Sequence, residues 1–546
     1  MRFPLRLASI LAFATLSSCS GCQKGGGEAR RFVGKEAEAI LEVRDLSLLV
    51  RTRQKLLANF GSVVSSQQVE GLQQEVTLRL GFDPSTPEGL AAAGLPPSGS
   101  VAVELKDGGS SALWVLPVAD GKKFAETLDK VVRARATVDE VSKEKVEGQE
   151  LTAFVSAFGA EKISVATYTL HQGFGLVGVG SQGKAMVLAA LSRKPETAIE
   201  AHPEYQAQVQ ALGSSWEARL ISPSGALALQ GALRTASRAL PLRGLDQHPD
   251  LARLKSAGWA LDFSGNTAKV QGRLRLDPEG LQKSKALFAS RGAPSPGVLA
   301  VDLPRAAIFL QVAGSVPGLL EAIAPAGTPP RAKLEALYAK LKSDLSTDLE
   351  KEVLPILSGH AAVAVGLGDL GGRGFEVLMQ NPLGLLWSAA AIGVEDPSAL
   401  LAVERRLDPG LTAQGLQIGS REVGGIKIRS VTQSIGGTPA TLVESFGREK
   451  AMILANEPVI ADQLATSVGK DRLGGQPGLA LEVRFTELSR SVAAVDLGSA
   501  PLLFRSMIAK GMETLASLDT LTAKVHPTED GIGMEATLKA RVGTGP

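Results

Sequence analysis

An order of strands and helices that occurs twice along the chain is the feature that most constrains the fold of these 546 residues. Residues 114–120 form an apolar strand pattern that ends in Asp120, and the next residues have apolar side chains three and four apart, which predicts a helix. Residues 387–396 end in Asp396 and lead into the same helical pattern. Because aspartate is a preferred helix N-cap residue, we expect both positions to begin a helix directly after a strand.

Further segments match in the same order, at offsets of about 260 to 277 residues. They comprise an apolar strand after Ser-Gly, a hairpin with a central glycine, and a final pair of strands around a polar turn: residues 98–105 with 358–367, 146–151 with 423–428, and 259–276 with 518–538. This order predicts two homologous tandem halves, residues 35–290 and 296–546, joined by the Gly- and Pro-rich residues 291–297. Bunched hairpins with irregularly spaced helices favour an α+β fold. Each half is expected to be mainly an antiparallel sheet with helices packed on one face.

The first 18 residues have the layout of a secretory signal peptide, with Arg2 and Arg6 ahead of a short apolar run. That run, residues 7–16, is half of the roughly 20 residues that a transmembrane helix needs. Residues 16–19, Leu-Ser-Ser-Cys, resemble the lipobox of bacterial lipoproteins. The resemblance implies cleavage before Cys19, a lipid on its thiol, and anchoring of the mature chain in a membrane of the cell envelope.

An ordinary signal peptide is the alternative, and it would leave Cys19 as a spare thiol. The cysteine distribution favours the lipid, because Cys19 and Cys22 are the only cysteines and the body has none for disulfides. Cys22 follows a poorer lipobox and is the second choice for the lipid. Ser20 is not the aspartate that retains lipoproteins in the inner membrane of enteric bacteria, so the resemblance favours the outer membrane. The polar, glycine-rich composition predicts a lipidated flexible tether over residues 19–34.

Charge and composition exclude some classes of partner. The precursor has 58 basic and 56 acidic residues, and the signal peptide removes two arginines, so the mature chain has zero net charge. It has no global basic field to attract nucleic acid. Hydrophobic residues at 44% and charged residues at 21% are typical of a globular protein. With four Trp and three Tyr, the chain is poor in the aromatic platforms that bind sugars or single strands.

Three repeated features, the Asp-Leu opening, the Ser-Gly-x-Ala-Val strand and the Val-x-Asp helix start, resemble those of a family of exported bacterial proteins of unknown function. The resemblance covers parts of both halves. It implies no catalytic residues.

A glycine motif of dinucleotide sites, Gly-x-Gly-x-x-Gly, occurs at residues 178–183 between an expected strand and an expected helix. The matching segment of the second half, residues 453–458, has no such glycines. A turn with Ser181 or Asn456 as the helix N-cap explains both segments, so we predict no cofactor site.

The Ser-x-x-Lys motif of penicillin-binding enzymes occurs at residues 181–184 and 467–470. Neither the Ser-Asp-Asn nor the Lys-Thr-Gly motif that completes the set is present, so turns are expected here too. No pair of histidines has metal-ligand spacing: His171, His202, His248, His360 and His526. His360 lies in a predicted buried strand and is interpreted as a core or edge histidine with satisfied hydrogen bonds. The sequence therefore predicts no catalytic residue and no metal site.

The sequence predicts a lipid anchor and two homologous halves, and it has no recognisable cluster of catalytic or metal-binding residues. Together these features favour a non-enzymatic envelope lipoprotein with a binding or scaffolding role. Its expected partners are the membrane, through the lipid on Cys19, and an envelope protein or an apolar ligand, with no nucleic acid and no cofactor. A carrier of lipid or another apolar ligand is one alternative, for which an apolar cavity is expected. An envelope hydrolase is the other, for which a cleft with perturbed ionisable groups is expected.

Overall fold

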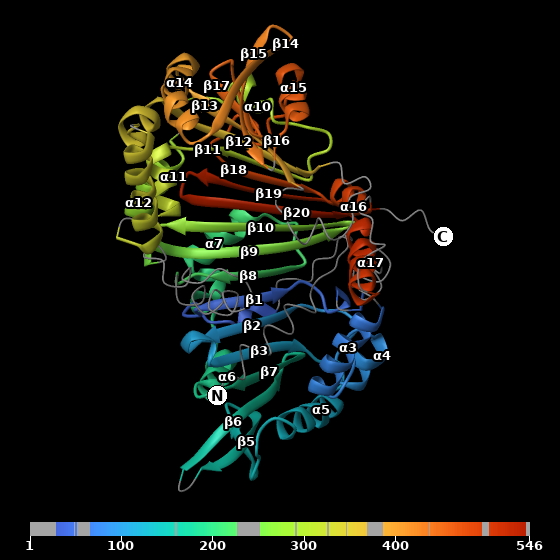
Figure 1. Cartoon of the computed structure of the whole chain (residues 1–546). Helices are drawn as coiled ribbons and strands as arrows, with labels where there is room; N and C mark the ends of the chain where they lie inside the picture. The colour runs from blue at the N-terminus through green and yellow to red at the C-terminus, as the bar shows by residue number, and fades with distance from the viewer. Residues whose placement is uncertain are drawn as a thin grey trace. The chain divides into compact units, whose positions relative to one another are not determined.

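The computed structural model describes residues 29–48, 50–51, 66–158, 161–225, 252–289, 292–324, 327–345, 347–368, 386–435, 437–493 and 502–541. The chain forms two compact units, and their helices and strands are labelled in Figure 1. The first unit is Met1–Gly280 with Asp530–Pro546, and the second is Leu281–Glu529. The predicted signal peptide and Cys19 lie outside the described residues.

The mixture of strands and helices fits the α+β prediction broadly, but the prediction of two tandem halves, residues 35–290 and 296–546, is wrong. The strands of the described residues join in one antiparallel sheet of 20 strands. The C-terminal strand β20 (Gly531–Ala540) pairs with β10 (Thr267–Leu276) and is part of the first unit. Without β20, the edge of β10 would expose a row of unpaired backbone N–H and C=O groups.

In the first unit the strands lie in the order β4-β5-β6-β7-β3-β2-β1-β8-β9-β10-β20, and every neighbouring pair is antiparallel. The remaining strands have these bounds: β1 (Ala39–Val43), β2 (Val101–Lys106), β3 (Ser111–Pro117), β4 (Glu140–Val146), β5 (Gln149–Phe158), β6 (Glu161–His171), β7 (Phe174–Val179), β8 (Ala218–Ser222) and β9 (Leu254–Ser264). The predicted hairpin at residues 146–151 is confirmed. Glu147 and Gly148 both have positive φ, as the tight turn between β4 and β5 requires.

Helices cover both faces of the first unit's sheet, and the prediction of one covered face is wrong here. Leu113 and Val115 of β3 pack with side chains of α6 (Gly183–Leu191) and α7 (Pro203–Leu212). Ala112 and Trp114 pack with side chains of α4 (Pro87–Ala92) and α5 (Gly121–Arg133). Successive side chains of a strand point to opposite faces, so β3 is buried on both. A further helix, α3, spans Ser66–Leu80.

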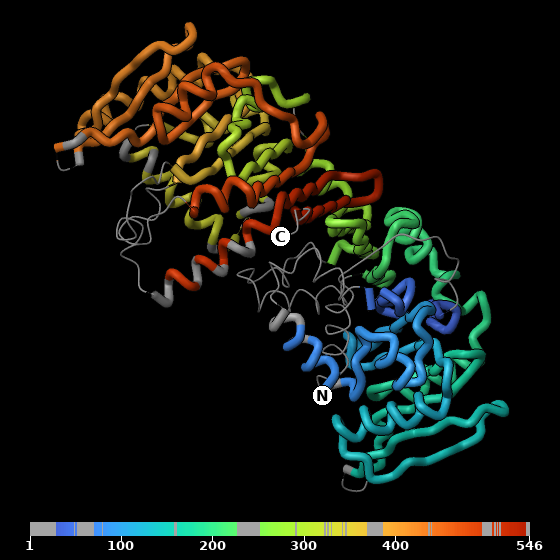
Figure 2. The backbone as a smooth tube through the Cα atoms, turned by 90° about the vertical axis from the view of Figure 1, so that its right-hand side faces the viewer, coloured from blue at the N-terminus to red at the C-terminus, as the bar shows by residue number. Residues whose placement is uncertain are grey.

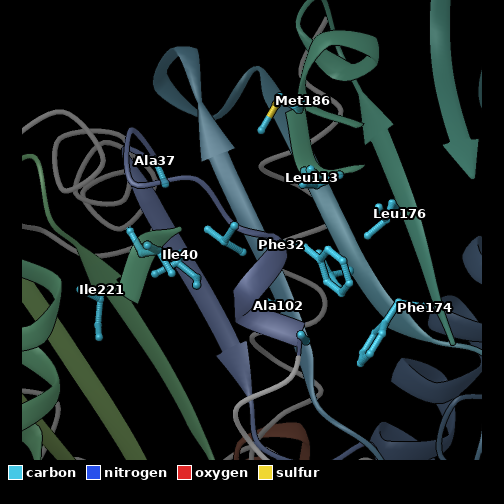
Figure 3. Close-up of a cluster of buried hydrophobic side chains, with 14 of the residues drawn as sticks. Phe32, Ala37, Ile40, Ala102, Leu113, Phe174, Leu176, Met186 and Ile221 are labelled. Carbon is cyan, nitrogen blue, oxygen red and sulfur yellow. The ribbon is translucent and has the colours of Figure 1, made fainter. Parts of the chain in front are cut away.

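The N-terminal end of the described chain is part of the first unit's core. The short helix η1 (Ala29–Phe32) places Phe32 against Phe174, with ring centroids 5.5 Å apart (Figure 3). The Ala29 N–H donates to Ser100 Oγ at 3.3 Å, and the Gly34 N–H donates to the buried Glu104 carboxylate at 2.9 Å. The core therefore begins inside the stretch predicted to be a tether, residues 19–34.

In the second unit the strands lie in the order β14-β15-β16-β17-β13-β12-β11-β18-β19, again all antiparallel. Their bounds are β11 (Ile308–Ala313), β12 (Leu357–Leu367), β13 (Leu386–Val394), β14 (Leu416–Val423), β15 (Ile426–Ile435), β16 (Thr438–Arg448), β17 (Ala451–Ala455), β18 (Gly478–Arg484) and β19 (Leu518–Thr528). The chain can be followed by colour through each unit in Figure 2.

The helices of the second unit leave one face of its sheet less covered. They are α10 (Pro296–Leu299), α11 (Val316–Ile323), α12 (Pro329–Leu345), α14 (Pro397–Ala413), α15 (Pro458–Thr466), α16 (Phe485–Ala493) and α17 (Leu502–Ser517), with α9 (Pro278–Leu287) at the boundary between the units. Trp387, Ala389 and Ala391 of β13 are buried against Ile460 and Leu464 of α15. The residues that alternate with them along β13 are partly exposed.

The predicted helix starts at Asp120 and Asp396 are confirmed. Each aspartate follows a strand, has extended backbone, and is the N-cap of the next helix. Asp120 Oδ1 accepts hydrogen bonds from the backbone N–H groups of Lys122 and Lys123, at 3.0 and 3.2 Å. Asp396 Oδ1 accepts from those at positions 398 and 399, at 2.8 and 3.3 Å. These bonds satisfy N–H groups that have no partner within the helix.

Candidate functional site: an apolar-walled pocket

A β-bulge at the start of β12 opens the sheet of the second unit beside α11. The pairing of β12 with β13 changes register between Leu357 and Ala361. Gly359 has a φ of +83°, and a Cβ there would lie 1.8 Å from the carbonyl oxygen of Gly314. Only glycine fits this position. The bulge leaves Ser358 on the wall of a pocket.

The N-terminus of α11 forms a second part of the wall. Ser315 is the helix N-cap, and its Oγ accepts a hydrogen bond from the Gly318 N–H at 3.1 Å. The Ser315 N–H in turn donates to the Leu287 carbonyl at 2.8 Å, at the end of α9. These bonds fix Val316 and Leu320 along one side of the pocket.

A π-helix, η7 (Leu349–Val353), brings a carboxylate to the same pocket. Its N-cap Asp348 accepts a hydrogen bond from the Lys351 N–H at 3.3 Å and forms an ion pair with Lys342 at 2.8 Å. Glu350, on this helix, lines the pocket. Short π-helices are rare and are frequent at functional sites.

These segments line an open pocket of about 560 Å³ within the second unit. Small-molecule sites span roughly 300–1,000 Å³. Most of its walls are apolar, and the complete lining is Ala289, Ser315, Val316, Pro317, Leu320, Glu321, Arg331, Glu350, Leu354, Pro355, Leu357 and Ser358. Leu320, Leu354 and Leu357 are all partly exposed. An apolar molecule that covers them gains about 25 cal/mol for each Å² removed from water.

The ionisable residues of the wall are Glu321, Arg331 and Glu350. Arg331 hydrogen-bonds Glu335 at 3.0 Å on the exposed side of α12. This bond, chiefly, raises the pKa of Arg331 above its ordinary value, and the charges of Glu335, Glu350 and Glu321 add to the effect.

A Ser–His contact lies at the edge of the pocket. Ser358 Oγ is 3.2 Å from His360 Nδ1, and the His360 backbone N–H also points to this Oγ, at 3.4 Å. His360 is 3% exposed, and burial lowers its pKa. Glu395 and Asp471 act on the ring through their charges and do not hydrogen-bond it. The contact is a local bond of the bulge, and His360 is buried in its strand, as predicted.

The glycines at residues 178–183 serve close packing. A Cβ on Gly178 would lie 2.0 Å from the carbonyl oxygen of Gly183, so the end of β7 touches the start of α6. The Gln182 N–H at this helix start donates to Ser111 Oγ at 3.2 Å. A turn therefore links β7 to α6, as predicted.

The capping roles predicted for Ser181 and Asn456 are wrong. Gln182 is the N-cap of α6 without a side-chain bond, and Glu457 is the N-cap of α15. Asn456 instead accepts a hydrogen bond from the Ser388 N–H at 2.7 Å, which ties the turn to β13.

The Ser-x-x-Lys motifs form separate contacts. Lys184 pairs with Glu144 at 2.6 Å, while Ser181 Oγ lies 3.3 Å from Ser111 Oγ. Ser467 Oγ donates to the Ala300 carbonyl at 2.9 Å. These bonds give both serines structural partners in place of a lysine.

Two of the other described histidines have structural contacts. His202 Nδ1 accepts a hydrogen bond from the Glu204 N–H at 3.1 Å and caps α7, and His171 packs edge-on against Phe32. His248 lies outside the described residues. Within the described ranges, no group of three or more His, Cys, Asp or Glu side chains could hold a metal ion.

The sequence patterns did not reveal the pocket. Its wall combines residues from 289 to 358, and these come from the segment after α9, the helices α11 and α12, a π-helix with the 3-10 turn that follows it, and a bulge. A weak signal is the apolar run at 316–320, which holds a proline and a glycine and stands directly after a serine cap. Such a run predicts a helix but not the space beside it.

Comparisons with known proteins give no family. No family model and no curated protein sequence matches the chain. Crystal forms I, III and IV of the protein TP0453 align with 46–50% of this chain and 79–90% of their own, at 12–13% identity. Their TM-scores are 0.24 to 0.25, too low to support a conclusion about fold or function. In the part of the chain that the structure describes, no helix has the length and apolar character needed to cross a membrane.

Proposed function

We propose that the chain is a lipid-anchored, non-enzymatic protein of the bacterial envelope that binds an apolar small molecule in the pocket of its second unit. The observation that carries this proposal is the pocket of about 560 Å³ with partly exposed leucines on its wall. The lipobox-like sequence at residues 16–19 supports the anchor, on Cys19. Binding alone needs neither a nucleophile nor a metal, which agrees with the structural roles of the Ser-x-x-Lys motifs and of His360.

Filling the pocket tests the binding function. Leu320 lines the pocket, whereas Leu337 of α12 is 50% exposed and is not part of the lining. Leu320→Trp places a large ring in the space, and Leu337→Trp is the matched control. N-phenylnaphthylamine, a neutral dye that fluoresces in apolar surroundings, is the probe. We expect the wild type and Leu337→Trp to bind the dye, and Leu320→Trp to bind it at least about tenfold more weakly. Equal binding by both variants would exclude this pocket as the site.

The anchor is tested separately, by labelling cells with radioactive palmitate. We expect Cys19→Ser to abolish labelling and to remove the protein from the detergent phase. Cys22→Ser, the matched control, should retain both properties. Continued labelling of Cys19→Ser would place the lipid on Cys22, and loss of labelling only in Cys22→Ser would do the same.

A further inference from the structure

We propose that the apolar ligand of this pocket carries a hydroxyl group, so that it is a long-chain or polycyclic alcohol. The inference rests on the proposed binding function and adds the chemistry of the ligand's polar end. The hydroxyl lies between the side chains of Ser315 and Ser358. The hydrocarbon part covers the partly exposed leucines of the wall, Leu320, Leu354 and Leu357.

The two serines come next to each other at one end of the pocket. The Gly314 N–H donates to the Gly359 carbonyl at 3.0 Å, where the chain leaves β11 beside the bulge of β12. Ser315 follows Gly314, and Ser358 precedes Gly359 in the antiparallel neighbour, so the two serines form the next pair. Both line the pocket and both are half-buried. A small polar group of a ligand can therefore reach both hydroxyls.

The charged residues of the wall are less suited to the ligand's polar end. Arg331 is already hydrogen-bonded to Glu335 at 3.0 Å. Glu321 and Glu350 are exposed to solvent. The two serines are the uncharged polar residues of the described lining. A charged head would also lose hydration between the apolar walls, which a neutral head loses at smaller cost.

Ser315 has hydrogen-bonding capacity left for a ligand. A serine hydroxyl has one donor and two acceptor positions. As the N-cap of α11, Ser315 Oγ accepts a hydrogen bond from the Gly318 N–H at 3.1 Å. Among the described residues, this bond uses one acceptor position. The O–H and the second lone pair are therefore available to a ligand.

Ser358 has one position left, and its kind depends on the proton of His360. Ser358 Oγ accepts from the His360 backbone N–H at 3.4 Å and lies 3.2 Å from His360 Nδ1. If the serine O–H donates to Nδ1, one lone pair of Oγ remains. If Nδ1 carries the proton and donates it, the serine O–H remains. Ser358 thus offers a ligand either an acceptor or a donor.

A ligand hydroxyl matches the two serines in both cases. It donates one hydrogen bond and accepts at least one, so it can donate to one serine and accept from the other. An ether or an ionised carboxylate only accepts, and an ammonium only donates. Each of these groups leaves one of the wall hydroxyls without a partner when the ligand excludes water, and this lowers affinity.

The experiment compares two neutral probes of equal size on the full chain, 1-decanol and its isomer-like ether 1-methoxynonane. They have the same number of non-hydrogen atoms, but the ether cannot donate a hydrogen bond. Each competes with N-phenylnaphthylamine. We expect decanol to displace the dye at a concentration about fivefold lower, although the ether is the more apolar molecule.

Variants of the serines locate the hydroxyl. Ser315→Ala combined with Ser358→Ala should remove the preference for the alcohol. Ser420→Ala removes an exposed hydroxyl from β14, outside the pocket lining, and should keep the preference unchanged. Because Ser315 caps α11, the midpoint of thermal unfolding checks the fold of the double variant. Ser358→Ala alone keeps this cap, and it should weaken the binding of decanol about threefold.

The outcomes separate the inference from the function on which it rests. If neither probe displaces the dye, the binding function fails and the inference fails with it. If both displace it and the ether is as effective as the alcohol, binding stands and the hydroxyl is wrong. An unchanged preference for decanol in the folded double variant, or unchanged binding of decanol to Ser358→Ala, would also overturn the inference.

Discussion

The central strands of the two units differ in how completely they are buried. In β3 of the first unit six of seven residues are buried, whereas in β13 of the second unit buried and partly exposed residues alternate. Helices α4, α5, α6 and α7 supply apolar side chains to both faces of the first unit's sheet. The first unit is therefore closed on both faces, and the second has room for a ligand.

The segments beyond the first strand of each unit show the same difference. After β1, the first unit fills the space with Leu46, Leu48, Leu90 and Leu95, which are between 0 and 7% exposed. After β11, the second unit has the pocket, and its wall leucines are partly exposed. Side-chain packing, and not strand order, decides where this protein has space for a small molecule.

The ion pairs compared here are also more deeply buried in the first unit than in the second. Glu42 of β1 and Arg219 of β8 lie opposite each other in the sheet and are both about 2% exposed. Tyr205 completes the group, because its hydroxyl donates to Glu42 and accepts from Arg219 at 2.8 Å. In the second unit, Arg484 and Glu482 pair with side chains 22% and 12% exposed.

The largest expected effect comes from breaking the buried pair. Arg219→Ala leaves the Glu42 carboxylate buried without its cation, which costs about 3–5 kcal/mol. Arg484→Ala removes a partly exposed cation and should cost about 1 kcal/mol or less. Urea unfolding followed by hydrogen exchange of peptides from each unit measures both. Equal losses would show that the two units are equally closed.

The next largest difference in stability is expected when a leucine of each unit is shortened to alanine. Leu90→Ala in the filled region of the first unit should cost about 3 kcal/mol, because it leaves a cavity in a packed core. Leu320→Ala should cost about 1 kcal/mol or less, because the pocket already exposes this side chain to water. Urea unfolding followed by hydrogen exchange of peptides from each unit measures both losses of stability. A Leu320→Ala loss as large as that of Leu90→Ala would mean that the pocket is closed in solution.

The two units should also respond to pH in opposite directions. Burial raises the pKa of Glu104 in the first unit, and the Gly34 N–H, Lys106 and Arg193 only partly offset it. Burial acts in the same direction on Glu482 of the second unit, but its bonds to Arg484 and Arg472 outweigh burial and lower its pKa.

The stabilising contribution of Glu104 is therefore fully present below its unfolded pKa and is lost as the pH rises through its raised folded pKa. The contribution of Glu482 is present above its unfolded pKa and is lost as the pH falls through its lowered folded pKa. We would measure the free energy of unfolding as a function of pH for wild type, Glu104→Gln and Glu482→Gln. The difference between wild type and each variant isolates the contribution of that carboxylate. If both differences in unfolding free energy changed with pH in the same direction, the opposite pKa shifts of Glu104 and Glu482 would be contradicted.

The smallest expected loss of stability comes from removing a helix N-cap, and it should be the same in both units. Asp120→Ala and Asp396→Ala each remove two hydrogen bonds at a helix N-terminus, and each should cost about 1 kcal/mol. Amide exchange at the starts of α5 and α14 reports the loss locally. A much larger cost at one cap would show that the helix starts are not equivalent.

The sequence predicted features that depend on neighbouring residues. The caps at Asp120 and Asp396 and the hairpin turn at Gly148 follow from side-chain chemistry over a few positions. The position of β20 could not be predicted, because Gly531–Ala540 pairs with a strand more than 250 residues earlier. Periodicity shows that a strand exists but does not identify its partner.

The candidate site was beyond the reach of pattern analysis for the same reason. Leu320, Glu350 and Ser358 come together only because a bulge at Gly359 and a π-helix displace regular structure. The pair of Glu42 and Arg219, 177 positions apart, is another case. Whether an apolar residue fills a core or lines a pocket depends on the volume of its neighbours, which sequence period does not record.

Binding of an apolar molecule in the second unit is tested directly by photocrosslinking with a neutral dodecanol that carries a diazirine on its chain. The protein is the full chain in detergent, and the crosslinked peptides are identified by mass spectrometry. We expect crosslinks to concentrate in residues 315–321 and 349–358, and an excess of N-phenylnaphthylamine to suppress them. Crosslinks concentrated in the first unit, or spread evenly over both units and insensitive to the competitor, would contradict this binding.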